Sequence, residues 1–208
     1  MKLETKPGFA FLLFFAVVAA CIISYVFFDI PAARFCASIG PGIKSIFNLI
    51  TRLGLSTPYE IATAAAFVYF QFVKRNRVAA NAAVFLFVAV SLSGVANDLI
   101  KVLVGRSRPD LLLHQGVYGF VRFTGQYSYA SFPSGHADTI AALCYGLYII
   151  ASRLKFILAG VALAVMASRV IVGAHFPSDV LFGAYLGFVV THYLGLAFEK
   201  RGVPIAFR

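Results

Sequence analysis

The sequence predicts an all-α fold: a six-transmembrane-helix bundle with an external interfacial helix. Three observations predict it. The 208-residue chain is 61% hydrophobic and only 12% charged, whereas a soluble domain of this length needs far more polar surface. The chain also contains uncharged runs close to the ~20 apolar residues that a spanning helix needs. These runs are continuous, unlike the alternating segments of about ten residues in outer-membrane barrels. We interpret residues 1–208 as one domain.

Six apolar stretches account for the predicted spans. The few charged residues within them, such as Glu60, Asp138 and Arg169, lie near an end of their stretch. Short connections between the second and third and between the fourth and fifth stretches predict antiparallel neighbours. The stretches are Gly8 to Phe28, Leu53 to Val73, Val78 to Asn97, Gly135 to Ala151, Phe156 to Ser168 with an extension to Ala174, and Val180 to Phe198.

The first stretch has an alternative interpretation as a cleaved signal. Val18 to Cys21 reads VAAC and resembles a lipoprotein cleavage site. However, the apolar run continues to Phe28, whereas the apolar region of a signal ends at the cleavage site. The continuation favours an uncleaved first span.

The formal charge of +10 indicates membrane topology rather than nucleic-acid binding. With the N-terminus inside, basic residues fall in short cytoplasmic loops and termini, as the positive-inside rule expects. Eight bases lie on the other side, but five of these belong to or adjoin the motifs described below. We therefore predict that both termini are cytoplasmic. The cytoplasmic bases are Lys2, Lys6, Lys74, Arg75, Arg77, Arg153, Lys155, Lys200, Arg201 and Arg208.

Two segments between the predicted spans lie outside. In the first, Asp29 to Gly54, apolar residues recur at helical spacing, while polar residues face elsewhere. This pattern predicts an amphipathic helix in the membrane interface, or alternatively a short helix packed on the bundle. The apolar residues are Ile43, Ile46, Phe47 and Ile50, and the polar ones are Lys44, Asn48, Thr51 and Arg52.

The second external segment, Gly105 to Phe132, is rich in aromatic residues, which favour the headgroup level of a membrane. It either shapes a pocket for a lipid headgroup or anchors the chain at the interface. The aromatic residues are Tyr118, Phe120, Phe123, Tyr127 and Tyr129.

Three short motifs concentrate charge in this apolar chain, where charge is costly. The first, Lys101 to Pro109, reads KVLVGRSRP. Lys101 offers a point charge to phosphate and Arg108 a planar fork. Pro109 should stop any continuing helix, and Arg106 should add positive potential to the mouth of the site. By itself the motif also fits bases that reach the interface with long side chains.

The second motif, Pro133 to His136, reads PSGH and opens the fourth span. Ser134 is expected to cap the helix. The free N–H groups of the first turn, together with the helix dipole, form an anion site. Gly135 allows an oxygen to approach the backbone, and His136 would lie beside a bound phosphate. A simple cap with an interfacial histidine is the alternative.

The third motif, Ser168 to Asp179, reads SRVIVGAHFPSD. His175 and Asp179 share a face if the turn is helical, and Pro177 suits the first turn of the sixth span. A carboxylate that accepts from one imidazole nitrogen would make the other nucleophilic. A structural His–Asp pair is the alternative. The predicted topology places all three motifs on the same external face.

Together the motifs match K-x6-R-P, P-S-G-H and S-R-x5-H-x3-D. The chain therefore resembles the type-2 phosphatidic acid phosphatase family of integral membrane lipid phosphatases, by motif over residues 101 to 179 and by its six-span layout throughout. The resemblance implies metal-independent catalysis through a phosphohistidine, with His175 as nucleophile, Asp179 as its orienter and His136 as the acid. It also implies that the phosphoryl oxygens are held by Lys101, Arg108, Ser134, Gly135 and Arg169.

Metal and cofactor sites are not expected. Asp98 lies three residues before Lys101 and should pair with it. The other acids near the motifs do not form the oxygen cages that divalent metals require. The cysteines have no metal-ligand spacing and indicate no disulfide framework. These residues are Asp110, Asp138, Asp179, Cys21, Cys36 and Cys144.

The leading functional hypothesis is hydrolysis of a lipid phosphate or diphosphate at the periplasmic or external face of the plasma (bacterial inner) membrane. A lipid phosphotransferase with the same phosphohistidine is the second hypothesis. A catalytically silent lipid-binding or transport protein is the third, and the intact set of charged residues argues against it. The bilayer and the lipid substrate are the expected partners. The sequence names neither the lipid nor the oligomeric state.

Overall fold

Helices form all the regular secondary structure of the part that the structure describes, except for an isolated bridge between Arg106 and Phe120. This computed structural model describes residues 7–206, and side chains from residue 10 to residue 206. The predicted cytoplasmic bases Lys2, Lys6 and Arg208 lie outside that range.

A helix occupies each of the six apolar stretches. The elements in chain order are α1 (Pro7–Ile23), the π-helical η1 (Ser24–Phe28), α2 (Asp29–Ala37), α3 (Pro41–Ile50), η2 (Thr51–Gly54), α4 (Ser56–Val68), η3 (Tyr69–Val73), α5 (Arg77–Val104), α6 (Pro109–Gln115), η4 (Tyr127–Tyr129), α7 (Gly135–Ile150), η5 (Ser152–Leu154), α8 (Lys155–Ile171) and α9 (Pro177–Lys200).

Four helices among the described residues are long and apolar enough to cross a membrane. With 13 and 16 residues, α4 and α7 are shorter. The all-α prediction is therefore confirmed for an integral membrane protein, whereas the count of six spans stays a prediction. The four helices are Ala10–Ala37, Arg77–Val104, Ser152–Ile171 and Pro177–Lys200.

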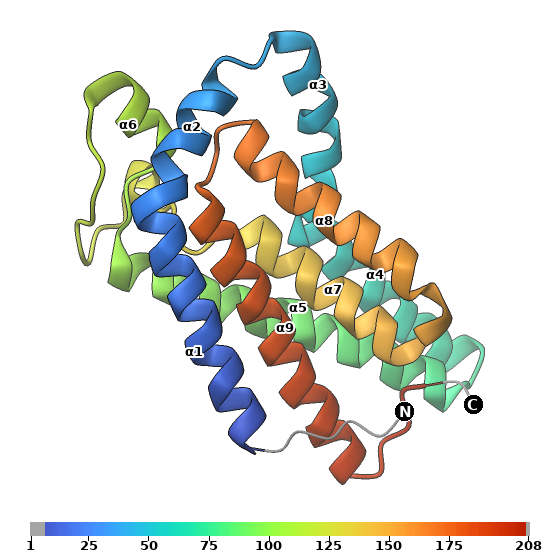
Figure 1. Cartoon of the computed structure of the whole chain (residues 1–208). Coiled ribbons are helices and arrows are strands. Elements are labelled where there is room, and N and C mark those ends of the chain that lie inside the picture. The colour runs from blue at the N-terminus through green and yellow to red at the C-terminus, as the bar shows by residue number, and fades with distance from the viewer. Residues whose placement is uncertain (1–6, 207–208) are drawn as a thin grey trace.

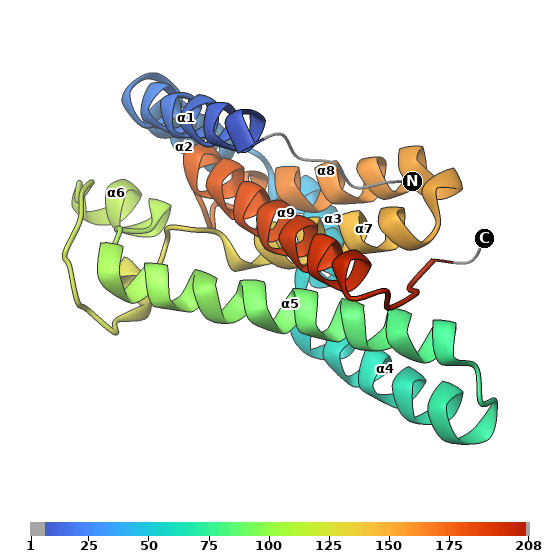
Figure 2. The same ribbon diagram turned by 90° about the horizontal axis from the view of Figure 1, so that it is seen from below.

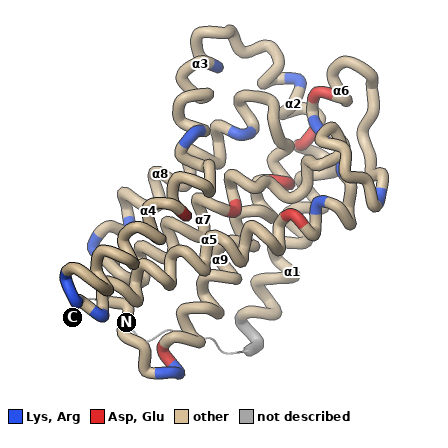
Figure 3. The backbone as a smooth tube through the Cα atoms, turned by 180° about the vertical axis from the view of Figure 1, so that it is seen from behind, with Lys and Arg blue, Asp and Glu red and all other residues tan. Residues whose placement is uncertain are grey.

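The helices stack in layers around α7, which packs against α5, α8 and α9 (Figure 2). On the outer sides, α1 covers α9, and α4 covers α5. The start of α1, the end of α9 and the start of α5 lie at one end of the bundle (Figure 1). Lys and Arg gather at the two ends and are sparse along the helical middle (Figure 3).

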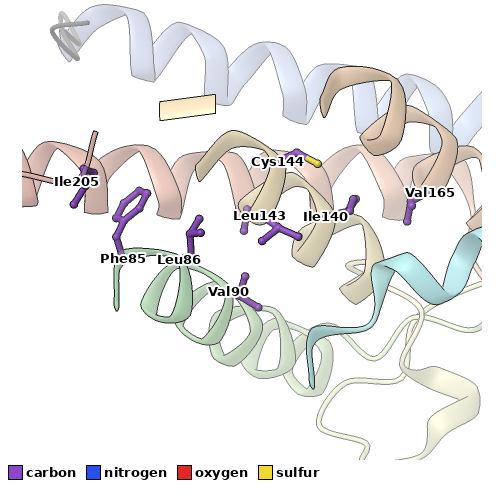
Figure 4. Close-up of a cluster of buried hydrophobic side chains, with 9 residues drawn as sticks. Phe85, Leu86, Val90, Ile140, Leu143, Cys144, Val165 and Ile205 are labelled. Carbon is purple, nitrogen blue, oxygen red and sulfur yellow. The ribbon is translucent and has the colours of Figure 1, made fainter. Parts of the chain in front are cut away.

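An apolar cluster fills the space between the central helices (Figure 4). Phe85 and Val90 of α5 and Ile140 of α7 belong to this cluster, and all three side chains are almost completely buried. Val165 of α8 closes the cluster on another side. Such close packing fixes the position of α7, whose first turn carries the second motif.

Two glycines let α9 approach α7 very closely. A Cβ atom on Gly183 would lie 2.4 Å from the carbonyl oxygen of Ser134, and one on Gly187 would lie 2.2 Å from that of Asp138. Small residues allow membrane helices to pack with their backbones in contact. This contact sets the first turns of α7 and α9 side by side, and the Ser134 N–H donates to the carbonyl of Asp179 at 3.0 Å.

The boundary of the first external segment is corrected by the structure. The first apolar helix continues through η1 and α2 to Ala37 rather than ending at Phe28. Asp29, expected outside, is fully buried. The helix can continue because the Asp29 carboxylate finds partners inside the protein, including the hydroxyl of Ser24, which donates at 2.8 Å.

The predicted amphipathic helix exists as α3, with Ile43 and Ile46 more than half exposed and none of its residues buried. Its placement in a membrane interface stays a prediction.

At the end of α5, Pro109 does not stop the helix as expected. Gly105 ends it in the left-handed conformation at φ 61°, which suits glycine. Pro109 instead begins α6, where a missing N–H costs nothing.

We predict that Gly187→Ala destabilises the protein, because the new methyl group must displace the backbone of α7. Overpacking of this kind costs typically about 1–3 kcal/mol. The thermal unfolding midpoint of purified protein in detergent should fall. Gly160→Ala is the matched control, because Gly160 lies in α8 and a methyl group on it would meet nothing within 4 Å. An unchanged midpoint for Gly187→Ala would contradict the close contact.

Candidate active site

The three motifs meet at one end of the bundle, and backbone groups hold them together. Arg108 of the first motif donates from Nη1 to the carbonyl of Ala174, next to His175, at 3.0 Å. The N–H of His175 donates to the carbonyl of Arg169 at 3.2 Å. Together with the contact between Ser134 and Asp179, these bonds bring the predicted site residues into one cluster.

The imidazole of His175 is buried, with 3% of the residue exposed. Its Nδ1 lies 2.8 Å from the carbonyl oxygen of Ser131 and 3.7 Å from Oδ2 of Asp179. A carbonyl oxygen only accepts, so Nδ1 carries the proton and Nε2 keeps its lone pair. The carbonyl of Ser131, rather than the expected carboxylate of Asp179, therefore makes the bond that selects the tautomer.

Burial lowers the pKa of His175 from 6.5 to about 4. The positive charges of Arg108 and Arg169 act in the same direction, whereas Asp179 opposes them. At neutral pH His175 is consequently uncharged, which is the form that can act as a nucleophile.

Asp179 is fully buried and acts on His175 both directly, through its charge, and through Ser131. Its Oδ2 accepts from the hydroxyl of Ser131 at 2.6 Å and from the N–H of Phe176 at 2.9 Å. Its Oδ1 accepts from Arg106. The carboxylate thus fixes the residue whose carbonyl orients the imidazole.

Arg106 was predicted to add positive potential to the mouth of the site; instead it is buried and two carboxylates neutralise its charge. It is 1% exposed, and its guanidinium lies between the carboxylates of Asp179 and Asp29, the latter at 2.6 Å. Burial alone would lower the pKa of Arg106, but these carboxylates raise it above its ordinary value. The rings of Tyr25 and Phe176 lie 5.0 and 4.5 Å from the guanidinium carbon and exclude water.

Asp29 was missed by sequence reasoning. Its Oδ2 accepts from Arg106 at 2.6 Å and from the hydroxyl of Ser178 at 2.5 Å, and its Oδ1 accepts from the N–H of Ser178 at 3.1 Å. The available signal was a single acid that directly follows a long apolar run, because ionisable residues in such places are usually functional.

Arg108 is held from three sides. Besides Ala174, it donates to the carbonyls of Tyr127 at 3.0 Å and Ala130 at 3.1 Å. The ring of Tyr127 lies 4.0 Å from the guanidinium carbon. Burial lowers the pKa of Arg108, although it stays a cation. The aromatic segment therefore shapes the site.

Lys101, Gly135 and Ser134 form a cradle at the first turn of α7. The Lys101 ammonium donates to Asn97 at 2.5 Å and to Asp98 at 3.2 Å, so the predicted pair with Asp98 is confirmed. A Cβ on Gly135 would lie 3.1 Å from Nζ. Ser134 is the N-cap residue of α7, as expected, but its hydroxyl makes no cap hydrogen bond and, although buried, has no partner among residues 10–206.

The η2 turn covers the remaining side of the site, which the sequence did not predict. A Cβ on Gly54 would lie 2.7 Å from the Cβ of His136. Arg169 donates from Nη1 to the hydroxyl of Thr51 at 2.6 Å, while its Nε has no partner in the described part of the chain. Donors of Arg169 and Ser134 are thus available to an anion.

Metal-ligating side chains are not grouped here. Within the described residues no three His, Cys, Asp or Glu side chains are arranged to hold a metal ion. His192 lies in α9, where its Nδ1 is 2.8 Å from the hydroxyl of Tyr145.

Comparison with known proteins agrees with this arrangement. The PAP2 superfamily model matches residues 82–202. The lipid A 1-phosphatase of Rhizobium johnstonii is 30% identical over 201 residues, 91% of this chain and 81% of the relative. That of Rhizobium etli is 31% identical over 186 residues, 83% of this chain and 78% of the relative.

Two crystal structures share the fold. One is the first transmembrane PAP2-type phosphatidylglycerolphosphate phosphatase from Bacillus subtilis, with a TM-score of 0.66 and 24% identity over 95% of this chain and 98% of that one. The other is Aquifex aeolicus LpxE, with a TM-score of 0.59 and 22% identity; the match covers 81% of this chain and 94% of that one.

The fold and the motif-bearing site define an integral membrane phosphatase, a hydrolase of phosphoric monoesters. The chain belongs to the PAP2 superfamily, the type-2 phosphatidic acid phosphatase family.

We predict that Asp29→Ala strongly destabilises the protein, because it leaves the charge of Arg106 buried with one partner fewer. Breaking a buried ion pair in this way costs about 3–5 kcal/mol. Thermal unfolding in detergent measures the change. Asp110→Ala removes an exposed carboxylate and is the control, expected to leave the midpoint nearly unchanged. Equal effects of the two substitutions would contradict the importance of the buried network.

A second prediction concerns pH. Since the pKa of His175 is lowered to about 4, its imidazole should stay neutral well below the ordinary value of 6.5. In the unfolded chain the same group binds a proton near pH 6.5. Its neutral burial therefore costs no stability above pH 6.5 and costs progressively more as the pH falls toward 4. Histidine NMR, with the signal identified by its loss in His175→Asn, measures the titration. A midpoint near 6.5 would contradict the effect of burial.

Proposed function

We propose that this enzyme hydrolyses a phosphate or diphosphate monoester of a membrane lipid through a phosphohistidine formed on His175. One observation carries the proposal. The buried, neutral imidazole has its lone pair on Nε2, and it lies in the cluster that also holds cationic side chains and the first turn of α7. A nucleophile beside a phosphate cradle is the arrangement that phosphoryl transfer needs.

In the first step Nε2 of His175 attacks phosphorus. The N–P bond forms as the bond to the leaving oxygen breaks. His136, which takes up a proton when the phosphate anion lies beside it, gives that proton to the leaving oxygen. In the second step water attacks the phosphohistidine, His136 takes a proton from the water, and the N–P bond breaks to release inorganic phosphate. His136 is thereby reprotonated, so the cycle closes without a metal or a cofactor.

The cradle stabilises the charge on the transferred group. Lys101, Arg108 and Arg169 supply three cations, and the first turn of α7 adds N–H groups and the positive end of its dipole. The hydroxyl of Ser134 is a further donor, and Gly135 leaves the backbone accessible. Donors fixed in advance need no reorganisation during the reaction, which lowers the barrier.

The relatives indicate which lipid to test first. The two Rhizobium proteins are named lipid A 1-phosphatases and match most of this chain. A phosphorylated lipid of that type is therefore our first candidate substrate. The crystal structures, below 25% identity, support the fold alone.

The proposed topology has six spans, with α4 and α7 crossing together with the four longer helices. The cytoplasmic basic segments and the site would then lie at opposite faces, with the site in the periplasm or outside the cell. The amphipathic α3 would lie at that outer interface, where its exposed Ile43 and Ile46 contact lipid.

The enzymatic proposal predicts release of inorganic phosphate from a lipid phosphate by the purified protein in detergent. His175→Ala should abolish release, because it removes the covalent participant. Chelators should leave the wild-type rate unchanged. His114→Ala removes an exposed histidine outside the cluster and serves as the control. Transfer of labelled phosphate to a lipid instead of water would favour the phosphotransferase hypothesis, and loss of activity in chelator, restored by a divalent metal, would contradict the mechanism.

The topological proposal predicts that a cysteine placed at residue 76 is labelled only after permeabilisation, whereas one at residue 125 is labelled in intact cells. Residue 76 lies in the basic turn before α5, and residue 125 in the aromatic segment beside the site. A membrane-impermeant maleimide measures both. Labelling of residue 76 from outside would overturn the orientation.

A further inference from the structure

A polar pocket of about 200 Å³ opens beside His136. It lies between the start of α4, the last turns of α5 and the start of α7, and it is distinct from the buried surroundings of His175. One water needs roughly 10–15 Å³ of such space, so the pocket has room for a larger polar group. The lining residues used below are Thr57, Asn97, Asp98, His136, Asp138 and Thr139.

Two lining residues have unused hydrogen-bonding groups. Both carboxylate oxygens of Asp138 and Nδ2 of Asn97 are buried and have no partner among the side chains and backbone described. The residue exposure is 0% for Asp138 and 1% for Asn97. The hydroxyl of Ser93 lies beside Asp138 and 3.2 Å from the carbonyl of Val90. With its single hydrogen it can serve at most one oxygen of Asp138, so at least one carboxylate oxygen stays unpaired.

Such groups are costly unless something binds them. A buried polar group without a hydrogen bond costs about 1–3 kcal/mol, and more if it is charged. Asp138 also lies in the first turn of α7, where a negative charge interacts favourably with the helix dipole. The dipole does not supply the missing hydrogen bonds. An acceptor in Asp138 and a donor in Asn97, together with the hydroxyls of Thr57 and Thr139, match a ligand with several hydroxyl groups.

The position of the pocket relative to the chemistry identifies that ligand. Gly135 and His136 line the pocket, and the Lys101 ammonium lies close to Gly135. In the proposed reaction His175 attacks from one side of the phosphorus and the leaving oxygen departs on the other, beside His136. The alcohol that carries the leaving oxygen therefore begins next to this pocket.

We infer that the pocket binds the hydroxylated alcohol of the substrate, a sugar or glycerol unit, through Asp138, Asn97 and Thr57. This inference rests on the proposed function and narrows its substrate class. A polyprenyl alcohol carries no hydroxyl besides the leaving oxygen, so it would leave Asp138 and Asn97 unpaired. Sites built to bind hydroxyl groups discriminate strongly against analogues that lack them.

The test compares kcat/KM for two substrates, a glycosyl lipid phosphate whose sugar keeps free hydroxyl groups and a polyprenyl monophosphate. Wild-type enzyme should prefer the hydroxylated lipid by at least about 100-fold. Asp138→Ala should lower kcat/KM for that lipid by about 10-fold to 100-fold, and should change the polyprenyl substrate by less than about threefold. Asp110→Ala, an exposed acid outside the pocket, should change neither.

Asp138→Asn keeps the shape of the side chain, and Thr57→Val replaces a hydroxyl by a methyl group at the exposed rim. Each should cause a smaller loss with the same selectivity, so the test stands even if Asp138→Ala fails to fold. Equal losses on both substrates, no loss on either, or a wild-type preference for the polyprenyl substrate would overturn the inference. A wild-type enzyme that releases phosphate from no lipid would instead refute the proposed function.

Discussion

The buried ion cluster of Asp29, Arg106 and Asp179 is the interaction on which the site depends. One guanidinium joins three parts of the chain that are far apart in sequence: the helix after η1, the segment after α5 and the first turn of α9. Each of the three charges is buried and has lost its hydration. The free-energy cost of that desolvation is offset only because the charges pair with one another and accept or donate further hydrogen bonds. Ser178 supplies two of those bonds to Asp29, while Ser131 and Phe176 saturate Asp179.

The cluster helps to hold His175, whose Nδ1 lies closer to a carbonyl oxygen than to a carboxylate. Asp179 anchors the hydroxyl of Ser131, and the carbonyl of the same residue accepts from Nδ1 of His175. The anionic charge is thus kept 3.7 Å from the imidazole, and burial keeps the pKa of His175 low. Outer partners of this kind fix the tautomer and the orientation of a histidine ring.

Sequence reasoning identified the helical class, the apolar stretches and the residues that converge, because the motifs and the apolar runs are local signals. It misjudged Arg106, because the sequence around residue 106 contains no signal of its partners Asp29 and Asp179, which lie 77 and 73 positions away. It expected Pro109 to stop the helix, whereas α5 already ends at Gly105, whose N–H donates to the carbonyl of Lys101. It also gave no role in the site to Thr51 and Gly54. Thr51 contributes only its hydroxyl, and Gly54 contributes only the space left by the absence of a side chain, so neither forms a recognisable sequence motif.

The glycine contacts between α9 and α7 differ in kind from the contacts that η2 makes with the site. This difference bears on how related enzymes can come to differ from one another. Gly183 and Gly187 lock the helices that carry the reacting groups into one rigid unit. The segment of residues 51–57 meets that unit through Thr51 and Gly54, and Thr57 lines the pocket beside His136. If the proposed pocket binds the substrate alcohol, substitutions in this segment change the preferred lipid and leave the contact between α7 and α9 unchanged.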